Sequence, residues 1–153
     1  MLEAQGRAKA VTIGTRVMPR HVALTSVRWV VSLHLLVVLA QLAAAVTFLS
    51  GRAGAYGVHA TVGHALYLLG ICQAIAVVGV RSARQSPLTR WIAAAVPVAE
   101  VLQIYLARSG LVAWHLTLGL LVWTGALAVW IQVFARPDPT AVSGGDPGAG
   151  VGS

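Results

Sequence analysis

Two histidines begin apolar stretches of the chain in the same five-residue pattern. His59 begins "HATVG" and His115 begins "HLTLG", so both segments read His-x-Thr-x-Gly, 56 residues apart. Imidazole is a common axial ligand of haem iron, and a flat macrocycle takes one ligand on each of its two faces. Bundles of helices hold such cofactors between side chains of facing helices. The matched pair therefore predicts a bis-histidine haem site.

Two glycines and two arginines fit the same hypothesis. Gly63 and Gly119 lie four residues after the histidines, on the same helical face, where a missing side chain lets a macrocycle approach the backbone. Arg52 and Arg108 lie in the connecting segments, where a guanidinium group can pair with a propionate. The alternative is a site without a cofactor, because small residues also mark ordinary helix contacts in membranes.

Glu100 is the single acidic residue within an apolar stretch. Ionising a carboxyl group in a membrane is costly, so this residue marks either a proton-handling site or a neutral polar contact between helices. Gln41 is expected at a similar depth and is the predicted partner of Glu100, with Gln103 one turn away.

The other two intramembrane histidines are expected to support these sites. His64 follows His59 by five residues, about 140° around a helix, so the two cannot face one iron atom. His64 is then an alternative ligand, a hydrogen-bond partner or a packed polar residue, and we expect one of the last two roles. His34 shares a helical face with Gln41 and is expected to make an interhelical hydrogen bond, with a proton or quinone site as the alternative.

Composition places the chain in a membrane. Its 153 residues are 58% hydrophobic and only 10% charged, whereas soluble domains carry about 25% charged residues. The net charge of +7 comes from basic residues that flank apolar stretches, which indicates topology signals and lipid contacts instead of nucleic-acid binding. Cys72 is the single cysteine, which excludes a disulfide framework within the chain.

Four stretches are long enough to cross a bilayer, which takes roughly 20 apolar residues. They cover residues 29–49, 58–80, 91–107 and 111–134. The predicted fold is an all-α, integral membrane four-helix bundle of two helical hairpins over residues 29–134. Residues 1–28 form a basic cytoplasmic segment, and the Gly/Pro-rich residues 135–153 are expected to be a disordered tail.

The basic residues also predict the orientation of the chain. Those on one side of the predicted spans are Arg7, Lys9, Arg16, Arg20, Arg28, Arg81, Arg84, Arg90 and Arg136. Only Arg52 and Arg108 fall on the other side. Because cytoplasmic segments carry the excess of Lys and Arg, both termini are expected in the cytoplasm of a multi-pass plasma-membrane protein.

The two hairpins are expected to share one design. A Ser-Gly pair precedes each histidine segment, at 50–51 and at 109–110. Each histidine also follows a span with a central polar residue, Gln41 in the first half and Glu100 in the second.

The stretches "HATVGHALYLLG" and "HLTLGLLVW" resemble the segments that carry haem-ligating histidines in the heme A synthase family. The resemblance covers roughly residues 29–134 and one four-helix half of such an enzyme. It also extends to small four-span bacterial membrane proteins that look like isolated halves. It implies that His59 and His115 are haem ligands.

The chain departs from that family in two ways. Heme A synthases have two such halves, and typically a glutamate four residues before the first histidine, where this chain has Ala55. A b-type haem used for electron transfer or haem handling is therefore expected, with a membrane redox partner or a homodimer, and no hydroxylation chemistry. The alternatives are a cofactor-free accessory or structural membrane protein, and a small proton- or quinone-coupled module centred on Glu100. Whether the chain is an enzyme stays open.

Overall fold

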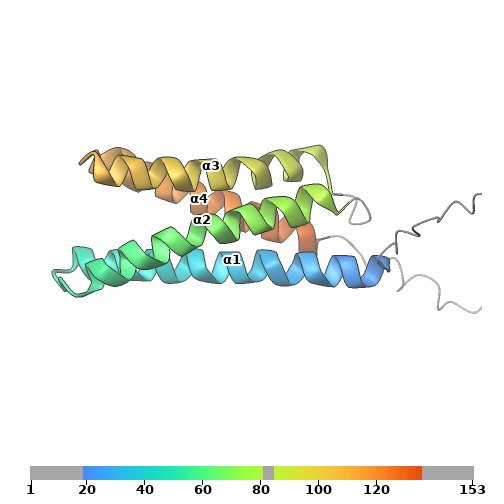
Figure 1. Ribbon diagram of the computed structural model, residues 1–153, viewed down its shortest axis with the longest axis horizontal. Coiled ribbons are helices and arrows are strands. Elements are labelled where there is room, and N and C mark those ends of the chain that lie inside the picture. Colours follow the sequence, from blue (N-terminus) through green and yellow to red (C-terminus); the bar gives the residue numbers. More distant parts are fainter. Residues whose placement is uncertain (1–18, 81–84, 136–153) are drawn as a thin grey trace, which may run out of the picture.

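The computed structural model describes residues 19–80 and 85–135, and all regular structure there is helical (Figure 1). The four helices are α1 Arg20–Leu49, α2 Ala55–Gly79, α3 Pro87–Arg108 and α4 Val112–Phe134. The predictions for residues 1–18, 81–84 and 136–153, and therefore for most of both terminal segments, lie outside the described residues.

Each of these four helices is long and apolar enough to cross a membrane, which confirms the predicted integral membrane helices. Three of them match the predicted spans to within four residues at either end. The exception is α1, which begins at Arg20 instead of residue 29. The predicted span begins after Arg28 because this residue is charged. A long cationic side chain at a membrane interface does not interrupt a helix, so α1 extends past it. The Arg28 guanidinium carbon lies 5.4 Å from the centroid of the Phe134 ring.

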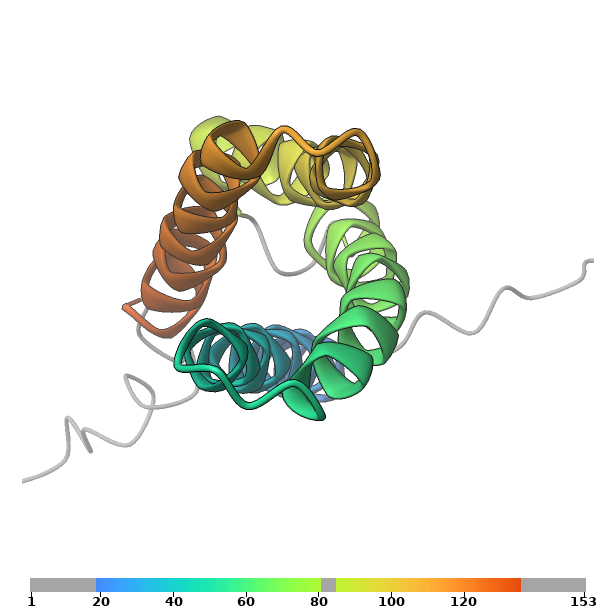
Figure 2. The same cartoon turned by 90° about the vertical axis from the view of Figure 1, so that its left-hand side faces the viewer.

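The helices stand side by side with their long axes roughly aligned, and they form a four-membered ring when viewed from one end (Figure 2). Consecutive helices are neighbours, and α4 closes the ring against α1. Helices α2 and α4 therefore occupy opposite corners. We call the end with the α1–α2 and α3–α4 connections the turn end, and the end where α1 begins and α4 finishes the terminal end.

The interior is built from small apolar side chains, while the large ones point outward. One buried cluster near the terminal end includes Val31, Val77, Ala93 and Val129. The exposed side includes large residues such as Leu36, which is 63% exposed. Soluble proteins bury such residues, whereas membrane helices pack through small residues and expose large ones to lipid. The ring of helices is therefore suited to a lipid environment.

Both connections at the turn end close in the same way. Gly51 and Gly110 have φ angles of 89° and 72°, a left-handed conformation that glycine adopts without strain. After α1, Gly51 N–H donates to the Phe48 carbonyl and Arg52 N–H donates to the Thr47 carbonyl. The same pair of hydrogen bonds follows α3, and this pattern is the Schellman motif. The Ser-Gly pairs predicted as turns are therefore helix ends of identical form.

Candidate functional site

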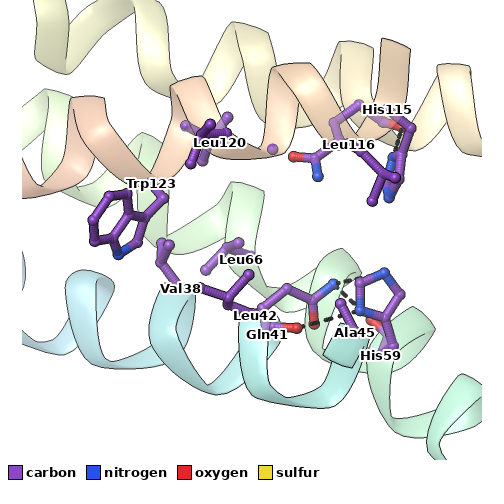
Figure 3. Close-up of a pocket in the computed structure, with 13 residues that line it drawn as sticks. Val38, Gln41, Leu42, Ala45, His59, Leu66, His115, Leu116, Leu120 and Trp123 are labelled. Atoms are coloured by element: carbon purple, nitrogen blue, oxygen red, sulfur yellow. Dashed lines mark hydrogen bonds between the residues drawn. The ribbon is translucent and has the colours of Figure 1, made fainter. Parts of the chain in front are cut away.

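His59 on α2 and His115 on α4 face each other across the ring near the turn end (Figure 3). The centroids of the two imidazole rings are 6.1 Å apart, and the ring planes are inclined by 83°. Both residues lie in the first five positions of their helices, and both are half-buried. The structure therefore brings together the two histidines that the repeated pattern singled out.

Each histidine is oriented by a backbone carbonyl of the preceding helix. His59 Nδ1–H donates to the Gln41 carbonyl at 3.4 Å, and His115 Nδ1–H donates to the Gln103 carbonyl at 3.0 Å. A hydrogen bond of this kind fixes the tautomer and leaves Nε2 with its lone pair, as in metal-ligating histidines. The Gln41 side-chain amide also lies 3.5 Å from His59 Nε2, a long and weak contact.

The two glycines of the pattern accommodate these glutamine side chains. A Cβ atom added at Gly63 would lie 2.9 Å from Gln41 Nε2, and one added at Gly119 would lie 2.7 Å from Gln103 Nε2. The Gln41 amide that lies against Gly63 donates to the His59 carbonyl at 2.9 Å. In this structure the glycines therefore admit the amide groups of Gln41 and Gln103.

Gln41 and Gln103 are the equivalent residues of the two halves. The sequence comparison had paired Gln41 with Glu100 as the central polar residue, and this assignment is wrong. The reason lies in the connections, because Gln41 precedes its histidine by 18 residues and Gln103 precedes its histidine by 12. The difference hides the correspondence until the helices are seen in space.

Two cavities lie beside the histidine pair, and both imidazoles line both of them. The larger, of about 240 Å³, is lined mainly by apolar side chains of α1 and α4, with Trp123 at its far end (Figure 3). The smaller, of about 170 Å³, lies between α2 and α3 and includes Arg108 and His64. Ligand pockets commonly measure roughly 300–1,000 Å³, so the two spaces together are of ligand size.

The spacing of the imidazoles fits two ligands on opposite sides of one metal atom. With a metal–nitrogen bond of about 2 Å and about 1 Å from that nitrogen to the ring centre, the centroids of such a pair are roughly 6 Å apart. Among residues 19–80 and 85–135, no group of three or more His, Cys, Asp or Glu side chains could hold a metal ion. His59 and His115 are thus a pair of imidazole donors without a third ligating side chain among the described residues.

Of the two arginines expected to pair with propionates, Arg108 lines a cavity beside the histidines and Arg52 does not. Arg108 donates from Nη2 to His64 Nε2 at 3.3 Å, and both residues line the smaller cavity. His64 Nδ1–H donates to the carbonyl of Ala60 in its own helix, which satisfies the expectation of a hydrogen-bonded polar residue. Arg52 is exposed in the α1–α2 connection and lines neither cavity.

A second polar cluster lies deeper in the bundle, where His34 bridges α2 and α3. His34 Nδ1–H donates to Gln73 Oε1 at 2.8 Å, and His34 Nε2 lies within hydrogen-bonding distance of Glu100 Oε1, at 2.8 Å. His34 and Gln73 are fully buried, and Glu100 is 2% exposed. The interhelical hydrogen bonding expected of His34 is confirmed. The predicted pairing of Glu100 with Gln41 is wrong, because Gln41 turns instead toward His59.

Gln73 and Gly70 of α2 belong to this cluster and were not anticipated. A Cβ atom at Gly70 would overlap Glu100 Oε2, so the carboxyl group lies directly against the α2 backbone. Gln73 could have been found, because a lone amide within an apolar helix implies an interhelical partner. The role of Gly70 carries no signal in the sequence, since glycines are common throughout this chain.

The chain was also compared with known proteins. No protein-family model, no curated protein and no solved structure matches it.

Proposed function

We propose that this membrane protein binds one b-type haem between α2 and α4, where His59 and His115 would hold the iron. Its role would be electron transfer or haem handling in the membrane. The observation that carries the proposal is the pair of facing imidazoles, whose centroids are 6.1 Å apart. A pair of ligands on opposite faces of one iron requires a separation of that size.

Three further observations support the proposal. Each ligand candidate has Nδ1 at a backbone carbonyl, at 3.4 Å for His59 and 3.0 Å for His115, and a hydrogen bond there would leave the Nε2 lone pair available to a metal and raise its basicity. The cavities on the two sides of the pair offer space for a flat group that extends toward α1 and α3. Arg108 at the smaller cavity is a cation suited to a propionate.

The protein's own residues have separate tasks in this proposal. His59 and His115 hold the iron, and the carbonyls of Gln41 and Gln103 fix the imidazole orientations. The haem, when bound, supplies a one-electron redox centre. The Gln41 amide would leave the neighbourhood of His59 Nε2, because a nitrogen that ligates iron no longer accepts a hydrogen bond.

We further propose that the chain lies in the plasma membrane with both termini in the cytoplasm, so that the haem site faces the outer side. The excess of basic residues at the terminal end supports this orientation. The structure's two-part design, in which Gln41, His59 and Gly63 correspond to Gln103, His115 and Gly119, supports a symmetric arrangement of two hairpins around the macrocycle.

Absorption spectroscopy tests the proposal. The full chain is expressed with an adequate haem supply and purified in detergent, and we expect a Soret band with low-spin α and β bands. His59→Ala and His115→Ala should each abolish the low-spin spectrum. His21→Ala is the matched control, because it removes an exposed imidazole at the start of α1 that lines neither cavity.

Two results would overturn the assignment. A wild-type protein without a Soret band would leave a membrane protein with no haem. A low-spin spectrum that survives both alanine substitutions, or that is lost in His21→Ala, would place the ligands elsewhere.

A further inference from the structure

We propose that His34, Gln73 and Glu100 form a proton-binding site whose occupancy is coupled to reduction of the group held by His59 and His115. The inference rests on the proposed haem function and adds to it a task for the deeper cluster. The cluster takes no part in holding the haem, and two of its polar atoms, Glu100 Oε2 and Gln73 Nε2, are buried without a hydrogen-bond partner.

The hydrogen bonds around His34 fix the number of protons in the cluster. Its Nδ1–H donates to Gln73 Oε1, so Nε2 and Glu100 Oε1 can lie 2.8 Å apart only with a proton between them. Whether that proton is closer to the nitrogen or to the oxygen, the pair is neutral overall. The observed arrangement is therefore the state with the proton bound.

Gln73 can serve the state without the proton as well. When the shared proton leaves, the remaining imidazole proton moves to Nε2 and donates to the Glu100 carboxylate. Nδ1 then carries a lone pair, and rotation of the Gln73 amide presents to it the Nε2 group that is now unpartnered. A glutamine has both a donor and an acceptor, so one buried side chain completes both states.

A proton is the ligand that the packing admits. His34 and Gln73 have no exposed surface, and Glu100 lies so close to Gly70 that a single added carbon would overlap its Oε2 atom. A metal ion or a quinone head group would need space that these contacts occupy.

The proton reaches the cluster from the turn end. Toward the terminal end lies the buried apolar cluster that contains Val31, Val77 and Val129. Toward the turn end lies a thinner layer that contains Val38 and Leu66, and both of these residues also line the larger cavity. One layer of side chains thus separates the proton site from the cavity beside the histidine pair.

Within the part of the chain that the structure describes, no other charged group makes a hydrogen bond or ion pair to the cluster. From α1 the cluster receives His34, from α2 the uncharged Gln73 and Gly70, and from α3 Glu100 itself. On α4, Val129 belongs to the apolar cluster toward the terminal end and Ala126 to the one toward the turn end, and neither carries a charge.

The two sites are close enough to influence each other. On α1, His34 and Gln41 are seven residues apart, which is about 10 Å along the helix axis. Unit charges about 10 Å apart at an effective dielectric constant of about 20 change an equilibrium roughly tenfold. Reduction by an external one-electron donor therefore raises the proton occupancy of the site between His34 and Glu100 by a fraction of a proton per electron, and the proton comes from water.

The test is a redox titration of the haem-loaded full chain between about pH 5 and pH 9. Loss of the proton leaves a negative charge that disfavours reduction, so the midpoint potential should fall as pH rises. The expected total change is about tenfold in the reduction equilibrium, or ~59 mV for a one-electron couple. Glu100→Gln stays neutral, so its potential should match the wild type at low pH and lie above it at high pH.

Two further variants complete the test. Thr89→Val removes a buried hydroxyl group near the terminal end and should keep the wild-type pH dependence. His34→Asn should lose the dependence and replaces Glu100→Gln if that variant does not fold. Reduced-minus-oxidised infrared spectra should show a carboxyl band that is absent in Glu100→Gln, and a purely structural cluster would give no such band.

The outcomes separate this inference from the proposed function. A protein without a haem spectrum overturns both. A haem-loaded wild type whose potential is independent of pH, or a pH dependence that persists in Glu100→Gln and His34→Asn, overturns the proton site and leaves haem binding intact.

Discussion

Adding one methyl group at Gly70 tests the close approach of α2 and α3. The Cβ atom of Gly70→Ala would overlap Glu100 Oε2, and it would lie 3.1 Å from Glu100 Cδ and 3.3 Å from Pro97 Cβ. All three residues are buried, so the helices must separate or the carboxyl group must leave His34. We expect a clear loss of stability.

The size of the loss follows from three contributions. Overpacking a buried position costs about 1–3 kcal/mol. Weakening a hydrogen bond to a charged or proton-sharing group costs about 1.5–3 kcal/mol. Alanine favours the helix over glycine by up to about 1 kcal/mol, which opposes these terms. The expected decrease in the free energy of unfolding is therefore about 2–5 kcal/mol.

Unfolding in mixed detergent micelles, followed by circular dichroism, measures this change. Gly57→Ala is the matched control, because it lies in the same helix and its added Cβ would meet nothing within 4 Å. The same Gly70→Ala change is then made in a Glu100→Ala chain, where the carboxyl group is gone. There the cost should largely disappear, since the double-mutant cycle isolates the coupling between the two positions. If Gly70→Ala is as mild as Gly57→Ala, or equally costly in both backgrounds, the geometry of the cluster is refuted.

Two other predictions concern stability and topology. Thr89→Val should lower the free energy of unfolding by about 1–2 kcal/mol, because the Thr89 hydroxyl donates to Gln132 Oε1 at 2.6 Å and joins α3 to α4; an unchanged unfolding curve would contradict this. Cysteine labelling in a Cys72→Ser chain tests the orientation. Arg52→Cys should react with a membrane-impermeant maleimide added outside cells, and Pro19→Cys should react only after the cells are opened. The reverse pattern would invert the proposed orientation.

The helices themselves could be predicted from the sequence because a bilayer imposes a length and an apolar composition on each of them. The histidine pair could also be predicted, since both residues lie in the first five positions of helices that begin at the same end of the bundle and therefore lie at similar depth. The pairing of Glu100 could not be predicted. It depends on how far each helix is rotated about its axis, and depth along the sequence does not determine that angle.

The same limit explains the mistaken correspondence between Gln41 and Glu100. Gln41 and Glu100 look equivalent in the sequence because each is a polar residue in the middle of a span. In the structure Gln41 contacts the histidine of the next helix, His59, whereas Glu100 contacts His34. In the second half, Gln103 is the residue that corresponds to Gln41. It contacts His115 through its backbone carbonyl and Gly119 through its side chain, and its residue type does not predict these contacts.

The larger cavity lies between α1 and α4, and its rim is formed by Leu42, Leu116 and Leu120, which are 49%, 47% and 60% exposed. On a bundle that spans a membrane, these rim residues meet lipid chains. A guest in this cavity therefore exchanges with the membrane interior through the side wall of the protein, and a buffer wash of intact vesicles would leave it in place. Delivery and removal of such a guest become events within the bilayer, governed by its solubility in lipid.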